Sequence, residues 1–466
     1  MKKALVCLLL FISVIAFYSC SKTSFITSKD ALVSTSADTL RFDTVFTTTG
    51  SVTHSFKIFN QNDQKLNISS VKLMGGPTSF FKMNVDGSPG TTFNNIEVAP
   101  NDSIYVFVTV TINPGASNLP FVVNDSVQVS YNGNNHFVQL EAYGQNANFI
   151  RSRRITTNTS WDNSLPYVIL GGVLVDSNVT LNINKGCRIY AHADAPIIIN
   201  GTLKVNGEKY DSTRVVFRGD RLDPDYKDFP GSWPGIYFGS SSRDNVLNFA
   251  IIKNAYQGII TQSHAAGSNY KVTLNECIID NIYDAGILSV NSSISARNCL
   301  ITNCGNNIAI AAGGTFSFNH CTVASYANAF LAHKNPVLFI SNMADGQSFA
   351  LNASFKNSIF YGEGGAIDDE IVIDQKGTIA PTIFFDNILY KNKNDIKPLP
   401  SNSINLKDQP PLFDSIDVGK RYFDFHLQLN SPAVNNGAAS NVTIDLDGNL
   451  RGRLSGLPDI GCYEKH

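Results

Sequence analysis

Acidic side chains gather densely at one place in the sequence, Asp368-Asp369-Glu370, which follows two glycines within a long insertion. Paired carboxylates can protonate a glycosidic oxygen and activate water, which is the chemistry of glycoside hydrolysis. The alternative is a solvated loop, because glycines and consecutive charges also favour exposed turns. Asp368, Asp369 and Glu370 are therefore a candidate acidic site with both interpretations open.

A second acidic pattern, Asp445-x-Asp447 followed by a glycine, places two carboxylates on one turn. Alternate carboxylates with a glycine can wrap a hard cation such as Ca²⁺. The bidentate Glu that would complete such a loop is missing, because position 454 is Leu. The alternative is a hydrogen-bonded turn in which Arg451 or Arg453 pairs with the two Asp residues. We expect no cofactor, and Ca²⁺ is the one metal that the sequence suggests.

Aromatic and acidic side chains cluster around the segment 220–232: Tyr226, Trp233 and Tyr237 lie near Asp223 and Asp225. Flat rings can stack on the C–H faces of sugars, and carboxylates accept hydrogen bonds from hydroxyl groups. These five residues are the candidate glycan-binding site. For Trp233 the alternative is a structural wedge that covers the first coils of a solenoid.

Composition restricts the class of protein that must position these residues. The 466-residue chain carries 36 Lys and Arg against 38 Asp and Glu, and only 16% of its residues are charged, against roughly 25% in average soluble domains. Nucleic-acid binding is not expected, because phosphate neutralisation needs a surplus of basic residues. The 43% hydrophobic content supports a large core and excludes intrinsic disorder.

The N-terminus has the pattern of an export signal. Two lysines precede an apolar run from Ala4 to Phe17, and small residues lead to Cys20. Ser19-Cys20 resembles the lipobox of bacterial lipoproteins, which implies that residues 1–19 are removed and that Cys20 carries the acyl chains. Ser21, where that family uses Asp for inner-membrane retention, implies an outer-membrane lipoprotein in the cell envelope. Residues 20–37 are predicted to be a tether.

Residues 38–147 alternate apolar and polar side chains at period two, as in Ser55-Phe56-Lys57-Ile58-Phe59. About seven short strands in a little over 100 residues are typical of an immunoglobulin-like β-sandwich. The stretch resembles the Ig-like modules near the anchors of bacterial surface proteins, which implies a spacer role.

From about residue 160 the sequence repeats a short strand, a turn and a second strand. A column of small residues recurs with spacings of 27, 22, 22, 37 and 29 residues: Ala250, Cys277, Cys299, Cys321, Ser358 and Asn387. A period in this range predicts a solenoid whose coils bury their apolar side against one another. Because stacked strands lie about 4.8 Å apart, Cys277, Cys299 and Cys321 are predicted to form an internal ladder of packed thiols.

The segment Trp233-Pro234-Gly235-Ile236 and the repeats resemble right-handed parallel β-helix proteins of the pectate-lyase-like fold. Residues 431–466 resemble the terminal segment of bacterial surface β-helix proteins, with Cys462 where Ala is usual. We therefore predict an all-β protein, an N-terminal Ig-like β-sandwich (38–147) followed by a right-handed parallel β-helix solenoid (148–430). Residues 431–466 are predicted to cap the open end of the solenoid.

Three functions follow from this organisation. The first is an exported, lipid-anchored surface protein without catalytic activity that binds a polysaccharide or a cell-envelope partner along the β-helix. The second, which the resemblance implies, is a polysaccharide lyase or glycoside hydrolase; its usual N-x-D, D-D, G-H-G and R-x-K signature is absent, although Lys253 and Lys271 are available as bases. Convergence of three or more acidic or basic side chains on one groove of a parallel sheet would favour this enzyme. The third is a structural or adhesive spacer.

Overall fold

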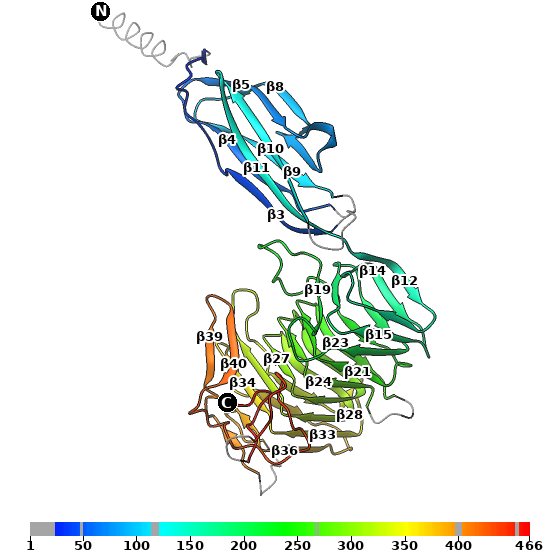
Figure 1. Cartoon of the computed structure of the whole chain (residues 1–466). Coiled ribbons are helices and arrows are strands. Elements are labelled where there is room, and N and C mark those ends of the chain that lie inside the picture. The colour runs from blue at the N-terminus through cyan, green and yellow to red at the C-terminus, as the bar shows by residue number, and fades with distance from the viewer. Residues whose placement is uncertain are drawn as a thin grey trace, which may run out of the picture. The chain divides into compact units, whose positions relative to one another are not determined.

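The computed structural model describes residues 24–46, 50–112, 121–265, 267, 270–396, 403–452 and 456–466. The predicted signal segment and Cys20, the predicted lipidation site, lie outside these residues. The described chain is all-β, with one 3₁₀ turn at Gly76–Thr78 (η1). In this part of the chain, no helix is long and apolar enough to cross a membrane. Two compact units, 1–146 and 147–466, divide the chain and are described separately (Figure 1).

The N-terminal unit is a sandwich of two β-sheets around one core. Its larger sheet has the order β1-β5-β10-β11-β3, with β8 beside β5, and its smaller sheet has the order β2-β4-β9-β6-β7. Alternating valines, isoleucines and phenylalanines of both sheets form a single buried cluster. The strands are β1 (Phe25–Ile26), β2 (Val33–Thr35), β3 (Thr39–Phe46), β4 (His54–Asn60), β5 (Lys65–Leu73), β6 (Phe81–Val85), β7 (Ser88–Gly90), β8 (Thr92–Val98), β9 (Ser103–Val110), β10 (Phe121–Tyr131) and β11 (Asn134–Gln145).

The predicted tether is wrong for the part of 20–37 that the structure describes. Strand β1 pairs with β5, and β2 pairs with β4 through Val33↔Asn60. Ile26 and Val33 pack against the core of the sandwich. Because these short strands bury apolar side chains at the sheet edges, residues 25–35 belong to the folded unit.

The second unit is a parallel β-helix, in which strands of successive coils pair in register on three faces. Sheet I begins with the first halves of β12 and β14 and continues through β16, β19, β22, β25, β27, β29, β34, β37 and β38. Sheet II contains their second halves, β17, β20, β23, the first halves of β26 and β28, β30 and β35. Sheet III contains β13, β15, β18, β21, β24, the second halves of β26 and β28, β33 and β36.

The strands of the first coils are β12 (Asn148–Ile155), β13 (Thr159–Trp161), β14 (Tyr167–Val175), β15 (Thr180–Asn184), β16 (Arg188–Ala191), β17 (Ile197–Ile199), β18 (Thr202–Asn206), β19 (Val215–Gly219), β20 (Ile236–Phe238), β21 (Asn245–Asn248), β22 (Ala250–Lys253), β23 (Gln257–Gln262) and β24 (Val272–Asn275). The later ones are β25 (Ile278–Asp280), β26 (Ala285–Arg297), β27 (Leu300–Thr302), β28 (Asn306–Asn319), β29 (Thr322–Tyr326), β30 (Leu338–Ser341), β33 (Leu351–Lys356), β34 (Ile359–Glu363), β35 (Ile371–Asp374), β36 (Thr382–Asp386), β37 (Leu389–Tyr390) and β38 (Leu406–Lys407). Two hairpins lie outside the coils: β31 (Met343–Ala344) with β32 (Gln347–Ser348), and β39 (Phe413–Asp417) with β40 (Tyr422–Leu427).

From β21 onward, the corner from sheet III to sheet I turns on one residue with positive φ in each coil. These residues have φ between 47° and 53°: Phe249, Glu276, Asn298, His320, Asn357 and Asn387. Asn adopts this left-handed conformation more readily than most residues. Asn387 therefore occupies the corner itself, and Ile388 follows Ala250, Cys277, Cys299, Cys321 and Ser358 in the column. The predicted column is therefore wrong at its last position, which holds Ile388 instead of Asn387.

The cysteines of the predicted ladder lie one after another inside the solenoid. Cys277, Cys299 and Cys321 are buried and free, and their thiols donate to main-chain carbonyl oxygens. Burial raises the pKa of the Cys299 thiol well above its usual value. Thiolate is the nucleophilic form of cysteine, so this environment favours packing over redox or metal chemistry.

The C-terminal segment 431–466 lies along the side of the solenoid on successive corners, rather than over one open end. Asn298 donates to the carbonyl oxygen of Ile444, Asn357 to that of Ala438, and Asn387 to that of Asn436. The hairpin β39–β40 and this segment share an apolar cluster with the outer side of sheet I. The last coil strand is β38, so the predicted solenoid range 148–430 includes a hairpin that belongs to this covering layer.

One prediction concerns His426, which joins the hairpin to the C-terminal segment. Its ring lies 2.9 Å from Asp447 Oδ2 and 2.5 Å from Asp424 Oδ1, and these carboxylates, Asp447 first, raise the pKa of His426 to about 9. Since the unfolded value is about 6.5, the stabilisation is fully present below pH 6.5 and is lost as the pH rises through 9. We expect an NMR titration midpoint of about 9, which moves toward the unfolded value in Asp447→Asn. An unshifted midpoint in wild type would contradict this pairing.

Candidate functional site

A column of outward-facing apolar side chains runs across sheet II of the first coils. Leu174 pairs with Ile198, Ile198 with Tyr237, and Tyr237 with Ile260, each in register on neighbouring strands. Their neighbours in sequence point inward and are buried, because side chains alternate between the two faces of a strand. The parallel register therefore repeats one apolar position from coil to coil and forms a continuous floor.

This floor lies in a surface groove of about 570 Å³. Its rim is polar but uncharged, since Asn200, Ser240 and Gln262 follow the strands of successive coils. A second hollow of about 240 Å³ shares Pro196 and Ile198 with the groove. The groove therefore extends back over β14 to Arg153 and Arg154.

Two exposed tyrosines stand at the corner that leads into this sheet. Asn254 and Asn281 have φ of 62° and 58°, and two residues after each of them come Tyr256 and Tyr283. The two rings are 47% and 53% exposed and stack with centroids 5.4 Å apart and an interplanar angle of 24°. Aromatic faces that are ordered but uncovered are unusual on a soluble surface and often mark binding sites.

The tyrosine pair adjoins the groove through the main chain before β20: the nitrogen of Tyr256 donates to the carbonyl oxygen of Trp233 at 2.7 Å, and that of Gln257 donates at 3.0 Å to the carbonyl oxygen of Pro234, which lines the groove. Burial first, then the charges of Tyr256 and Asp284, raise the pKa of the Tyr237 phenol. Asp284 also accepts a 2.7 Å hydrogen bond from Gln257 at the start of β23. The groove floor, the tyrosine pair and these polar groups thus form one amphipathic surface, which we call the sheet II groove.

Trp233 is not part of that surface, which corrects its prediction as a glycan-binding residue. Its side chain is 0% exposed, and its indole Nε1 donates a 2.9 Å hydrogen bond to the carbonyl oxygen of Lys253. It packs in the core of the solenoid with Ile236 and Ala255. No ring face is left for a sugar, so Trp233 acts as the structural wedge that the sequence offered as the alternative.

The other residues of the predicted cluster separate. Asp223 is buried and pairs with Arg221 at 2.7 Å, and the Arg221 guanidinium lies 4.0 Å above the ring of Tyr226. Asp225 is exposed on the same insertion. Among the five predicted residues, Tyr237 is the one that lines the groove.

The acidic run 368–370 is divided between surface and interior. Asp368 pairs with Lys393 at 3.2 Å, and Asp369 accepts hydrogen bonds from Asn394. Glu370 is buried and lies 2.8 Å from His333 Nε2. The three carboxylates therefore have separate partners and do not form one cluster.

Asp445 and Asp447 are occupied by protein groups. Asp445 is buried and accepts from the main-chain nitrogens of Asp447, Asn449 and Glu464 at 2.8 to 3.0 Å. Asp447 pairs with His426. Within the described ranges, no three His, Cys, Asp or Glu side chains come together in a way that could hold a metal ion. The pattern is a hydrogen-bonded turn rather than a calcium loop.

Sequence reasoning missed Ile198, Ile260, Tyr256 and Tyr283. One signal for the tyrosines was present: Asn-x-Tyr occurs at 254–256 and again at 281–283, which is the 27-residue spacing of the repeat. No comparable signal marks the two isoleucines, because outward and inward apolar residues look alike in a strand that is apolar throughout.

Comparisons with known proteins add little to this geometry. No model of a protein family matches the chain, and no curated protein matches it. A family 123 glycoside hydrolase from Clostridium perfringens, studied for glycolipid glycan hydrolysis, aligns over 24% of this chain and 25% of its own, with 12% identity and a TM-score of 0.18. The PapD-like domain 7 (ASH domain) of human CEP192 aligns over 27% of this chain and 90% of its own, with 12% identity and a TM-score of 0.17. The chain thus spans a quarter of that hydrolase.

Proposed function

We propose that the protein is an exported, lipid-anchored glycan-binding protein of the cell envelope and that the sheet II groove holds the glycan. The groove carries this proposal, because it combines an apolar floor, a polar rim and two exposed stacked rings. Sugar rings offer the complementary surface, with C–H groups on their faces and hydroxyl groups around their edges. Asn200 and Gln262 would hydrogen-bond those hydroxyl groups.

The shape of the groove favours a chain over a single sugar. Its floor repeats with the coils, about 4.8 Å apart, and continues from Ile260 back to Leu174. A polymer lying along the solenoid axis would meet similar contacts at each step. Anchoring through Cys20 follows from the lipobox resemblance, and the N-terminal sandwich, likened to Ig-like modules, would act as a spacer.

A glycan array probed with the full-length chain in detergent tests this function. We expect retention of at least one polysaccharide and weaker retention of its monosaccharides. An array without any bound glycan would overturn the proposal and favour a structural spacer.

A second candidate function is cleavage of the glycan, and one observation favours it. Charged side chains converge at a different pocket, beside sheet I, where Lys253, Asp280 and Arg421 lie together. This meets the condition set by the sequence for a lyase or hydrolase. Incubation with uronic-acid polymers, with and without Ca²⁺ or EDTA, decides between the two: new reducing ends or unsaturated products would establish an enzyme.

Substitutions in the groove should weaken glycan binding without unfolding the protein. For Tyr237→Ala and Tyr283→Ala we expect at least a tenfold rise in Kd for the array-selected glycan, about 1.4 kcal/mol, because each removes an aromatic contact face. Isothermal titration calorimetry measures the Kd. Tyr210→Ala is the matched control, since Tyr210 is 62% exposed and outside the groove. Equal Kd values for all three variants would contradict glycan binding in the sheet II groove.

A further inference from the structure

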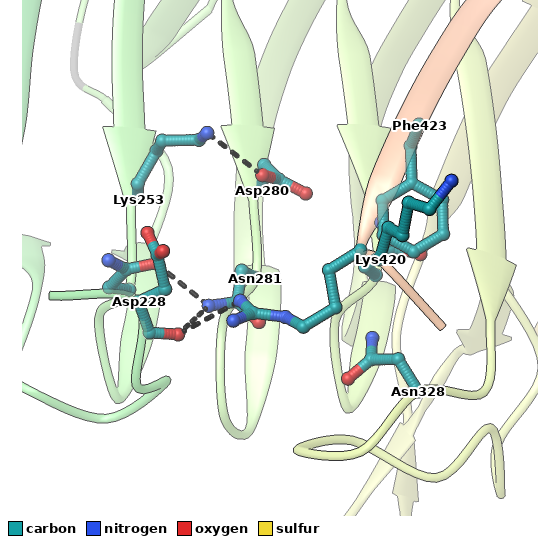
Figure 2. A pocket seen from close by; sticks show the side chains of 10 residues that line it. Asp228, Lys253, Asp280, Asn281, Asn328, Lys420 and Phe423 are labelled. Atoms are coloured by element: carbon teal, nitrogen blue, oxygen red, sulfur yellow. Dashed lines mark hydrogen bonds and ion pairs between the residues drawn. The ribbon is translucent and has the colours of Figure 1, made fainter. Parts of the chain in front are cut away.

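A separate polar pocket of about 170 Å³ lies beside sheet I, enclosed by three excursions of the chain. The insertion after β19 contributes Asp228, the loop after β29 contributes Asn328, and the tip of the β39–β40 hairpin contributes Lys420 and Arg421. Figure 2 shows Asp228, Asn328 and Lys420 around Lys253 of β22 and Asp280 of β25. The complete lining is Asp228, Lys253, Asn254, Asp280, Asn281, Asn303, Asn328, Lys420, Arg421 and Phe423.

A ladder of asparagines forms the corner side of this pocket. Asn254, Asn281 and Asn303 occupy equivalent corner positions with φ of 62°, 58° and 51°. Asn281 Nδ2 donates to Asn254 Oδ1 and to the main-chain oxygen of Asp228, both at 2.8 Å. The ladder therefore fixes the insertion against the coils, because both Nδ2–H groups of Asn281 and the Oδ1 of Asn254 are taken by protein partners.

The hairpin tip closes the pocket from the opposite side. The Arg421 guanidinium donates to the main-chain oxygen of Asp228 at 3.2 Å and lies 4.0 Å above the ring of Phe330. These contacts join segments that are about 90 to 190 residues apart in sequence, so the pocket exists only in the assembled fold. Such preorganisation lowers the entropy cost of binding a ligand.

The charges of the pocket nearly cancel, which narrows the class of ligand. Lys253 pairs with Asp280 at 3.2 Å, and Lys420 pairs with Asp417 at 3.4 Å. Arg421 and Asp228 remain, one positive and one negative group. A strong excess of cationic groups would select an anion, and a cluster of carboxylates would select a metal ion. Balanced charge with many hydrogen-bonding groups suits an uncharged ligand rich in hydroxyl groups.

We propose that this pocket binds a single uncharged sugar residue. The carboxylates of Asp228 and Asp280 accept hydrogen bonds from its hydroxyl groups, while Lys253 and Arg421 donate to their oxygens. The half-buried ring of Phe423 supplies an apolar wall for one face of the sugar. This site is distinct from the sheet II groove and shares no lining residue with it.

Saturation-transfer NMR and calorimetry on the full-length chain test the proposal with D-glucose, D-galactose, D-mannose and N-acetylglucosamine as probes. D-glucuronate and inorganic phosphate are the charged comparison. We expect at least one neutral sugar to bind more tightly than both anions. Tighter binding of either anion, or no bound neutral sugar at millimolar concentration, would overturn the proposal.

Two variants locate the binding. Asp228→Asn keeps the main-chain oxygen that holds Asn281 and Arg421, so the local fold is retained while the carboxylate is lost; Asp280→Asn removes the second carboxylate. We expect each to weaken binding of the neutral sugar at least tenfold, with an unchanged circular dichroism spectrum. Tyr237→Ala, in the groove, should leave this binding unchanged. If only Tyr237→Ala weakens binding of the neutral sugar, the sugar binds in the groove and the pocket is excluded as its site. If the protein binds the neutral sugar but no polysaccharide, the groove proposal fails and the pocket proposal stands.

Discussion

Replacing Arg451 with Met should destabilise the β-helix unit by about 3–5 kcal/mol, the cost of removing one partner of a buried ion pair. Arg451 pairs with Glu464 at 3.2 Å, and the two side chains are 2% and 3% exposed. Its guanidinium also donates to Asn298 Oδ1 and to the main-chain oxygens of Ile444, Gly461 and Cys462. The variant leaves the Glu464 carboxylate buried without its cation. It also removes the hydrogen bond from Arg451 to Asn298, which joins the C-terminal segment to a corner of the solenoid.

Urea unfolding of wild type and Arg451→Met, followed by circular dichroism, gives the difference in unfolding free energy. The double variant Arg451→Met, Glu464→Met is the control, because removing both charges removes the unpaired one. We expect the double variant to be more stable than the sum of the two single effects predicts. A loss below about 1 kcal/mol in Arg451→Met, as for exposed ion pairs, would show that the C-terminal segment does not depend on this residue.

Truncating Phe355 to Ala should cost a similar amount, about 3–5 kcal/mol. Phe355 is 0% exposed and stands in register between Phe318 and Phe385 inside the solenoid. The ring centroids are 5.4 and 5.1 Å apart. Removing the middle ring leaves a cavity and breaks both stacked contacts, while the paired backbones of β28, β33 and β36 prevent the gap from closing.

Phe384→Ala is the matched control for this substitution. Phe384 is the sequence neighbour of Phe385 on the same strand but is 54% exposed. Surface substitutions of this kind usually change stability by no more than about 0.5 kcal/mol. Equal losses in Phe355→Ala and Phe384→Ala, measured by urea unfolding, would contradict the inward and outward assignment of β33 and β36.

The solenoid was predictable because its signal is periodic. Cys277, Cys299 and Cys321 are the same residue type at a constant spacing of 22 residues. This spacing predicts one coil per repeat, and the coils of the structure stack in that way. The error at Asn387 has a physical cause: the left-handed corner favours Asn, and the small-residue column lies one position later. The column position itself holds Ile388, which is not a small residue, so the small-residue pattern pointed to Asn387 instead.

The candidate site was much less predictable than the fold. Trp233 was predicted to lie on the surface because it follows a polar insertion. It is buried because its ring packs in the core of the solenoid. Tyr256 and Tyr283 are 27 residues apart in sequence and stack only because their coils are neighbours. The pocket beside sheet I joins Asp228 and Arg421, and no local pattern connects residues so distant.

Oxidative footprinting of the unmodified protein tests the central claim, that the sheet II groove binds glycan, most directly. Mass spectrometry compares the modification rates of Tyr256 and Tyr283 with that of Tyr210, all of which are exposed. With the array-selected glycan at saturation, we predict that modification of Tyr256 and Tyr283 slows severalfold while modification of Tyr210 is unchanged. Unchanged rates at Tyr256 and Tyr283 under the same saturation would contradict the account.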